Sequence, residues 1–150
     1  MNIVIDGVSG IWTPEERKAK PSRFSWSDRS IKRMGKVHRD LVLVMEEAIR
    51  ITPVDLTVLE GRRSIERQKK LVASGASQTM NSRHITGHAV DVAPINEDGA
   101  VAWDWPLYHQ IAPAIKEAAL VVGVPIHWGG DWETFRDGPH WELPWQEYPA

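Results

Sequence analysis

The stretch that decides the fold is SRHITGHAVDVAPI, residues 82–95. Its second half is a short run rich in β-branched residues that Pro94 interrupts, which predicts a strand over 88–95. Its first half continues a polar segment without hydrophobic periodicity, which predicts a loop over 76–87. Polar side chains of the loop therefore lie next to the side chains of a short strand.

Two histidines and an aspartate in this stretch are candidate metal ligands. Side chains alternate along a strand, so Asp91 shares a face with Ala89, whereas His88 points to the opposite face. His84 lies on the loop and can fold back over the face of Asp91. We therefore predict that His84 and Asp91 are ligands, and that His88 lies beside the site in a structural or substrate-contacting role.

A second segment, RDGPHWEL at 136–143, supplies a third ligand. His140 follows a Gly-Pro turn, and three protein ligands with one open position are the usual arrangement at catalytic zinc sites. Asp137 lies three residues earlier, where its carboxylate can take a proton from a metal-bound water. Trp141, one of eight tryptophans, is either a core side chain or part of a substrate groove beside this motif.

Hydrolysis at a carbonyl also needs positive charge near the oxygen on which negative charge develops. The segment LEGRRSIERQ places Arg62 and Arg63 after a predicted strand over 54–61 and before a predicted helix over 64–75. Either arginine can direct a fixed charge at a carbonyl oxygen, and both can also be solvated surface residues. The residues alone leave that choice open.

The remaining segments complete a single α+β domain. A serine cap signal predicts a short helix after Ser25 or Ser27, and apolar residues at helical spacing predict longer helices, one of them with Pro113 near a boundary or a kink. These longer helices are expected over 38–51 and 106–123, and two further strands over 125–130 and 138–143. The order predicts a small, mostly antiparallel sheet with flanking helices over residues 24–150, after an N-terminal arm at residues 1–23.

Composition excludes several classes of protein. The length of 150 residues fits one domain, and the absence of cysteine excludes disulfides and thiolate metal sites. A net charge of −2 gives no electrostatic case for a nucleic-acid partner. No run approaches the length of a membrane span, and the N-terminus lacks the basic and apolar regions of a signal peptide. We therefore expect a protein made in the cytoplasm without stable membrane insertion.

Taken together, the motifs resemble those of the M15 zinc metallopeptidases. SRHITGHAVD is similar to their SxHxxGxAxD signature, and EGRRSIERQ, WGGDW and DGPHWEL are similar to segments of the phage endolysin branch, the L-alanyl-D-glutamate peptidases. The resemblance runs from Phe24 to Leu143 and leaves the N-terminal arm uncovered. It implies the small α+β fold of the D-Ala-D-Ala peptidases and the hedgehog signalling domain.

Carried over residue by residue, the resemblance implies one zinc ion per chain on His84, Asp91 and His140. It places His88 at a position that varies within the motif, which agrees with the strand alternation.

The same resemblance implies a role for each of the other motif residues. Asp137 takes the position of the general base, and Arg63, rather than Arg62, takes that of the arginine that polarises the scissile carbonyl. Ser82 and Gln68 match motif positions that shape the site or contact the substrate.

The activity implied is cleavage of the peptide stem of bacterial peptidoglycan between L-alanine and D-glutamate, which would lyse the host of a phage. Such an enzyme would be a monomer that waits in the host cytoplasm until a holin opens the inner membrane, and would act in the periplasm. Two alternatives remain: a D-Ala-D-Ala carboxypeptidase or dipeptidase, and a catalytically silent, zinc-stabilised wall-binding module. Asp137 and Arg63 favour an enzyme, since a closed structural zinc site needs neither a base nor an oxyanion partner.

Overall fold

A four-stranded antiparallel sheet forms the centre of the molecule. The computed structural model describes residues 4–5, 8–9 and 24–149. The strand order is β3 (Leu56–Glu60), β4 (Ala89–Pro94), β6 (His140–Glu142) and β5 (His127–Trp128). A separate antiparallel pair joins β1 (Val4–Ile5) and β2 (Val8–Ser9); the rest of the predicted arm at residues 1–23 lies outside the described residues.

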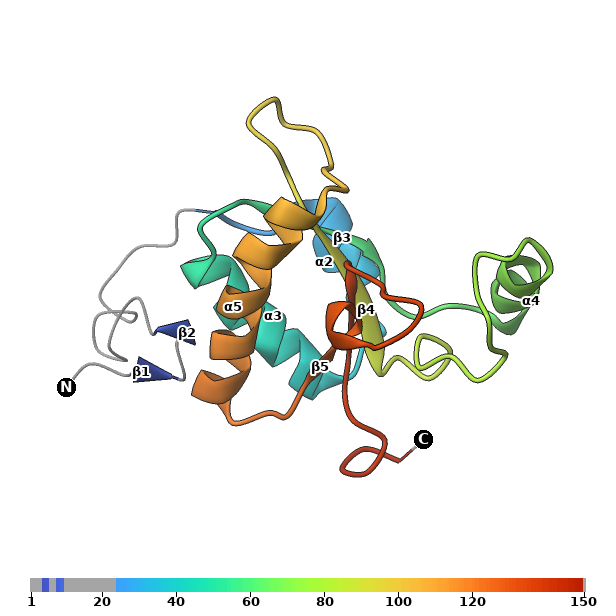
Figure 1. The fold of residues 1–150 in the computed structure, drawn as a ribbon. Coiled ribbons are helices and arrows are strands. Elements are labelled where there is room, and N and C mark those ends of the chain that lie inside the picture. Colours follow the sequence, from blue (N-terminus) through green and yellow to red (C-terminus); the bar gives the residue numbers. More distant parts are fainter. Residues whose placement is uncertain (1–3, 6–7, 10–23, 150) are drawn as a thin grey trace.

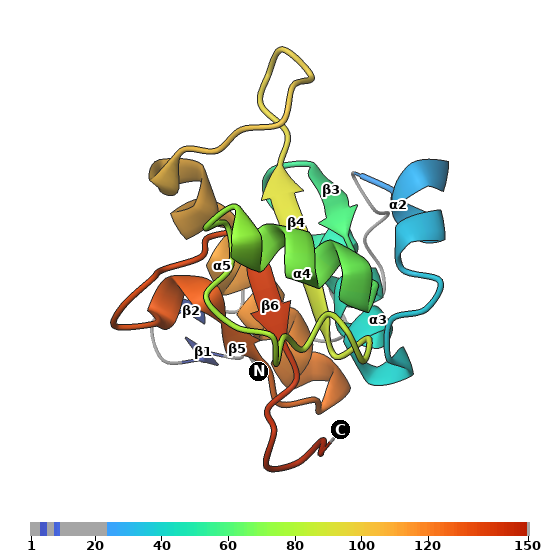
Figure 2. The same cartoon turned by 90° about the vertical axis from the view of Figure 1, so that its right-hand side faces the viewer.

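Helices lie on both sides of this sheet, which confirms the predicted α+β class. They are α2 (Asp28–Arg33), α3 (Arg39–Ile51), α4 (Ile65–Ala73) and α5 (Trp105–Val122), with a 3₁₀ turn η1 (Gly129–Asp131). Figures 1 and 2 show α3 and α5 together on one side of the sheet and α4 standing off on the other. No described helix is long and apolar enough to cross a membrane.

Serine caps fix the starts of two helices. The side chain of Ser27 accepts a hydrogen bond from Ser30 N at the start of α2, and that of Ser64 accepts one from Arg67 N at the start of α4. Each bond satisfies an amide that the helix itself leaves unpaired. Of the two serines predicted as the cap of the first helix, Ser27 and not Ser25 is therefore the one that caps it.

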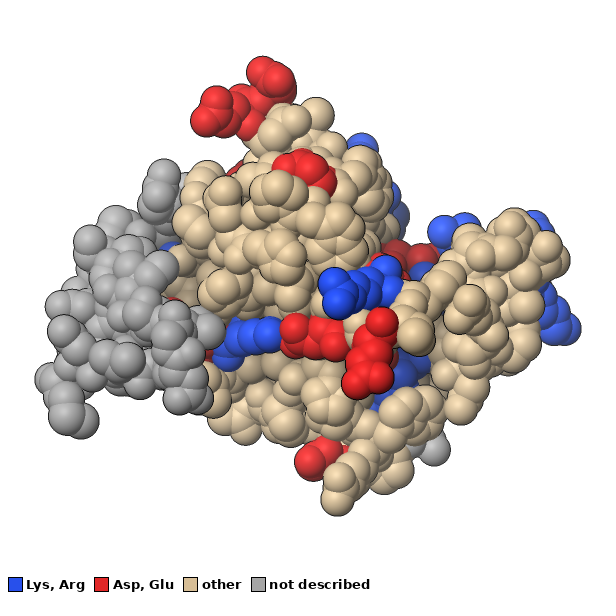
Figure 3. Space-filling model, in the orientation of Figure 1, with Lys and Arg blue, Asp and Glu red and all other residues tan. Residues whose placement is uncertain are grey.

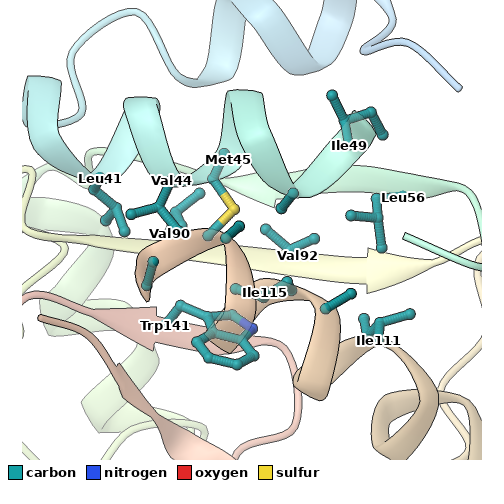
Figure 4. Packing of buried hydrophobic residues seen from close by; sticks show 14 of the residues in the cluster. Leu41, Val44, Met45, Ile49, Leu56, Val90, Val92, Ile111, Ile115 and Trp141 are labelled. Carbon is teal, nitrogen blue, oxygen red and sulfur yellow. The ribbon is translucent and has the colours of Figure 1, made fainter. Parts of the chain in front are cut away.

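The hydrophobic core lies between the sheet and the layer of α3 and α5. Leu41 and Met45 of α3, Val92 of β4 and Ile115 of α5 are fully buried and belong to one cluster, as the close-up in Figure 4 shows. Burial of these side chains is the main free-energy term that holds the two layers together. The strand therefore presents its other face to the opposite side of the molecule.

Helix α5 continues through Pro113 instead of ending near it. A proline inside a helix removes one backbone hydrogen bond and costs about 3 kcal/mol. Here the neighbouring residues Ala112, Ala114 and Ile115 are buried in the core, and this packing on α3 holds the helix together. The helical spacing of apolar residues on both sides of Pro113 thus predicted the extent of α5 better than the proline did.

Strand β5 is shorter than the predicted strand over 125–130, because η1 follows it directly. A Cβ at Gly129 would lie 2.5 Å from the carbonyl oxygen of Asp137, so only glycine allows this close approach. Gly129 O also accepts a hydrogen bond of 3.1 Å from Asp137 N. This contact closes the loop between η1 and β6 and sets the position of Asp137.

Candidate metal centre and its groove

Three predicted ligands come together on the face of the sheet opposite the core. Asp91 lies in β4 directly across from His140, the first residue of β6, and His84 reaches them from the turn before β4. Ligand atoms of these three side chains lie within 4.8 Å of one another. The predicted fold-back of His84 over Asp91 is therefore present, with 3.1 Å between His84 Nε2 and Asp91 Oδ1.

The backbone of this turn explains why His84 can reach the strand. Gly87 has a φ of +79°, a conformation that favours glycine, and a Cβ there would lie 2.5 Å from Lys36 O. Gly87 O accepts a hydrogen bond from His38 N, and the amide of His84 donates to Ser82 Oγ. These contacts hold the turn against the start of α3.

Hydrogen bonds on the far side of each imidazole leave its other ring nitrogen facing Asp91. His84 Nδ1 lies 2.8 Å from Gly61 O, to which it donates, so Nε2 faces Asp91. His140 Nε2 lies 2.7 Å from Glu142 Oε1, and its Nδ1 faces Asp91 Oδ1 at 3.4 Å. Metal-binding histidines commonly carry such outer partners, which fix the ring orientation and the tautomer.

The carboxylate of Asp91 and the imidazole of His140 change each other's pKa values. Burial alone would raise the pKa of Asp91, but attraction to His84 and hydrogen bonds with both histidines bring it well below its usual value. Burial alone would lower the pKa of His140, but hydrogen bonds with Asp91 and Glu142 raise it to about 9. Two imidazoles around an ionised carboxylate form a centre that favours a cation, and their nitrogen and oxygen donors suit zinc.

Asp137 lies in the groove over this centre. Burial and the nearby charge of Asp91 raise the pKa of Asp137, while His140, His84 and Arg63 oppose that shift. A carboxylate with a raised pKa accepts a proton more readily than an ordinary aspartate. The structure therefore places a carboxylate with a raised pKa in the same groove as the three candidate ligands.

Arg63 is held rigidly beside the centre. Its Nε and Nη2 donate to Glu60, its Nη1 donates to Gln68 Oε1 at 2.8 Å, and Nη2 lies 3.8 Å from Asp91 Oδ2. Glu60 in turn pairs with Asp91 across β3 and β4. Arg62 is exposed and donates from Nε to Ile85 O, away from the groove, so the structure brings Arg63 and not Arg62 to the site.

A groove of about 850 Å³ runs across the centre. Its lining comes from α4, the loop at 76–83 and residues 132–135, together with His84, Asp91, Asp137 and His140. Trp145 also lines it and packs against Arg83 of that loop, with 4.1 Å from Arg83 Cζ to the ring centroid. Figure 3 shows basic and acidic side chains gathered in the hollow between the part that carries α4 and the rest of the molecule.

The four residues suggested as substrate contacts lie in different surroundings. Ser82 lines the groove, whereas Gln68 is fully buried and donates from Nε2 to Ser77 Oγ and Thr79 O, so it shapes the site. The His88 ring lies 5.3 Å from that of His38, outside the groove.

Trp141 is fully buried and stacks on Trp128. The prediction of a substrate contact is therefore wrong for Trp141, because its alternation along β6 directs it into the core and not into the groove.

Sequence reasoning missed two carboxylates that position the site. Glu142 lies two residues after His140, and side chains two apart on a strand share a face, so the HWE motif contains a signal for their hydrogen bond. Glu60 precedes Arg63 by three residues and accepts from both Arg63 and Arg67. No spacing rule indicates that contact, because it depends on how the chain turns between β3 and α4.

Comparisons with known proteins agree on one family. The family of phage L-alanyl-D-glutamate peptidases matches residues 22–143. The L-alanyl-D-glutamate peptidase of Escherichia phage T5 is 30% identical over 119 residues, which cover 76% of this chain and 85% of that protein.

Two bacterial proteins are also similar. CwlK of Bacillus subtilis, a peptidoglycan L-alanyl-D-glutamate endopeptidase, is 28% identical over 60% of this chain and 61% of its own length. The crystal structure of the Serratia marcescens L-Ala D-Glu endopeptidase ChiX has 45% identity and a TM-score of 0.80 over 86% of this chain and 96% of that one. The chain therefore belongs to the phage L-alanyl-D-glutamate peptidase family.

Proposed function

We propose that this protein is a zinc-dependent endopeptidase that hydrolyses the bond between L-alanine and D-glutamate in the peptide stem of peptidoglycan. The observation that carries the proposal is the cluster of His84, Asp91 and His140, which opens into a groove beside Asp137 and Arg63. Three protein ligands and an open position are typical of catalytic zinc sites. The L-alanyl-D-glutamate bond and peptidoglycan are inferred from the related enzymes, which are L-alanyl-D-glutamate peptidases.

Each residue has a defined task in this proposal. His84 would hold zinc through Nε2 and His140 through Nδ1, with Asp91 as the third ligand. Bound zinc lowers the pKa of a water molecule to about 7 and polarises a carbonyl. Asp137 takes the proton from the attacking water and delivers it to the leaving amine of D-glutamate.

Arg63 stabilises the negative charge that develops on the alanine carbonyl oxygen. Glu60 and Gln68 hold its guanidinium in place, so little reorganisation is needed during the reaction, which is how fixed charges contribute most to catalysis. A closed structural zinc site would need neither this arginine nor a base in an open groove.

The biological role proposed is lysis of a bacterial host by a phage. The similarity to the enzyme of Escherichia phage T5 supports this role. The remaining expectations stay proposals: a monomer, which gains access to the periplasm through a holin and then acts on the wall.

The test is digestion of purified Gram-negative peptidoglycan by the chelated protein and by the same protein after zinc is restored. Mass spectrometry of the products should show new D-glutamate N-termini with zinc and none without it. Release of D-alanine would instead identify a D-Ala-D-Ala peptidase. Zinc binding without any cleavage would identify a wall-binding module.

A further inference from the structure

D-glutamate differs from most peptide residues because it carries a second carboxyl group, which a side chain of the groove can bind. Its amine lies in the scissile bond, and only one of its two carboxyl groups can continue the stem. The other carboxyl group stays free and ionised unless it is amidated. A substrate with D-glutamate on the leaving side therefore carries a negative charge within about one residue length, ~3.8 Å, of the bond that breaks.

Three arginines line the groove in the described part of the chain: Arg63, Arg67 and Arg83. The Arg63 guanidinium is already held by Glu60 and Gln68. Arg83 is 2% exposed, and it donates to the carbonyl oxygens of Leu143 and Tyr148. Neither of these two arginines has an exposed face available for a second carboxylate.

Arg67 differs from both. Its side chain is 57% exposed, and its Nε donates to Glu60 Oε2 at 2.6 Å. Among the described residues, its two terminal Nη groups have no hydrogen-bond partner, so one edge of the guanidinium is free for a carboxylate in a charge-assisted pair.

Glu60 sets the place of Arg67 relative to the reaction. One carboxylate oxygen of Glu60 binds Arg63 and the other binds Arg67, so the two guanidinium groups lie on either side of a single carboxylate. Burial raises the pKa of Glu60, but the hydrogen bonds from Arg63 and Arg67 outweigh it and keep the group ionised. Arg67 is thus the neighbour of the arginine assigned to the scissile carbonyl.

We propose that Arg67 binds the free carboxylate of D-glutamate and so makes the enzyme select an acidic residue on the leaving side of the bond. The inference rests on the proposed function, because it assigns the leaving residue to the end of the groove at Arg67. Arg67 is then a specificity-determining residue, and amidation of the free carboxyl group should weaken the substrate.

The test compares two synthetic stem peptides that differ only at that group, one with D-glutamate and one with D-isoglutamine. We would measure kcat/KM for both with the zinc-loaded wild type, Arg67→Gln and Lys69→Gln. Lys69 is an exposed lysine of the same helix that does not line the groove. The wild type and Lys69→Gln should prefer the acidic peptide by about tenfold or more, the size expected for a hydrogen bond to a charged group.

Arg67→Gln should lose this preference, with a ratio near one that comes from slower cleavage of the acidic peptide. A general disturbance of Glu60 or Arg63 would slow both peptides equally and leave the ratio unchanged, which would overturn the proposal. Arg67→Lys keeps the charge without the planar fork, so its ratio should fall between the two; this variant decides the question if Arg67→Gln does not fold. A wild type that cleaves neither peptide would refute the proposed function itself.

Discussion

The two faces of strand β4 show how one short segment serves both stability and chemistry. On one face, Val90 and Val92 are fully buried in the cluster formed with α3 and α5. On the other, Asp91 contacts His84 and His140 beneath an open groove. The first face is held by non-directional apolar contacts, and the second by a few hydrogen bonds of fixed geometry.

This difference predicts which property each substitution changes. Loss of volume on the core face lowers the free energy of unfolding, because the cavity that remains cannot fully collapse. Loss of a polar partner on the groove face should change metal affinity or turnover, because the groups there are held by directional contacts with specific partners. The predictions below test this separation, beginning with the largest effect.

Asp137→Asn should lower kcat by about 10²–10⁴-fold, since removal of a general base typically costs this much. Zinc content and thermal unfolding should stay close to those of the wild type. Asp131→Asn is the matched control, because Asp131 is exposed and binds Lys116 outside the groove. Full activity of Asp137→Asn would remove Asp137 from the mechanism.

Glu142→Ala should weaken zinc binding by about 10–100-fold, the usual cost of removing the outer partner of a metal-binding histidine. Competition with a zinc chelator measures this affinity. Glu142→Gln keeps an acceptor for His140 Nε2 and should recover part of the loss. Glu133→Ala, which removes an exposed acid of the groove, should bind zinc as the wild type does; equal losses in both alanine variants would point to net charge and not to orientation.

Val92→Ala should lower the free energy of unfolding by roughly 2 kcal/mol, from two lost methyl groups and the cavity they leave. Turnover per folded molecule should not change. Urea denaturation measures the first quantity, and Val121→Ala on the exposed side of α5 should stay within about 0.5 kcal/mol of the wild type. A Val92→Ala variant with normal stability but altered kcat would show that the two faces are not independent.

His88→Ala should have the smallest effect, with one zinc ion per chain retained and activity near that of the wild type. His88 lies outside the groove, with its Nδ1 2.7 Å from Thr86 Oγ1. Metal analysis of the purified variant tests this. Loss of zinc would mean that His88, and not His84, is the ligand.

The sequence placed two of the three clustered side chains, His84 and Asp91, near each other from local information alone. His84 and Asp91 lie in one stretch, and the alternation of β4 separates His88 from them. The same rule, applied to β6, would have placed Glu142 beside His140 and Trp141 in the core. The error at Trp141 came from its position next to a motif, which does not determine the direction of a side chain.

Other features depend on tertiary contacts that no periodicity describes. Glu60 and Gln68 hold Arg63, and not Arg62, at the site. Their positions depend on the turn between β3 and α4. The continuity of α5 through Pro113 depends on burial against α3. Periodicity alone could not weigh these contacts, and the family resemblance supplied only the first.

Zinc-edge anomalous scattering from crystals of the zinc-loaded protein would test the separation of the two faces of β4 most directly. We expect one strong peak on the groove face, bound by His84 Nε2, Asp91 and His140 Nδ1, with its fourth position open to the groove. A peak bound through His140 Nε2 would contradict the orientation set by Glu142. A peak that involves His88, or none at the three predicted ligands, would contradict the assignment of the catalytic face itself.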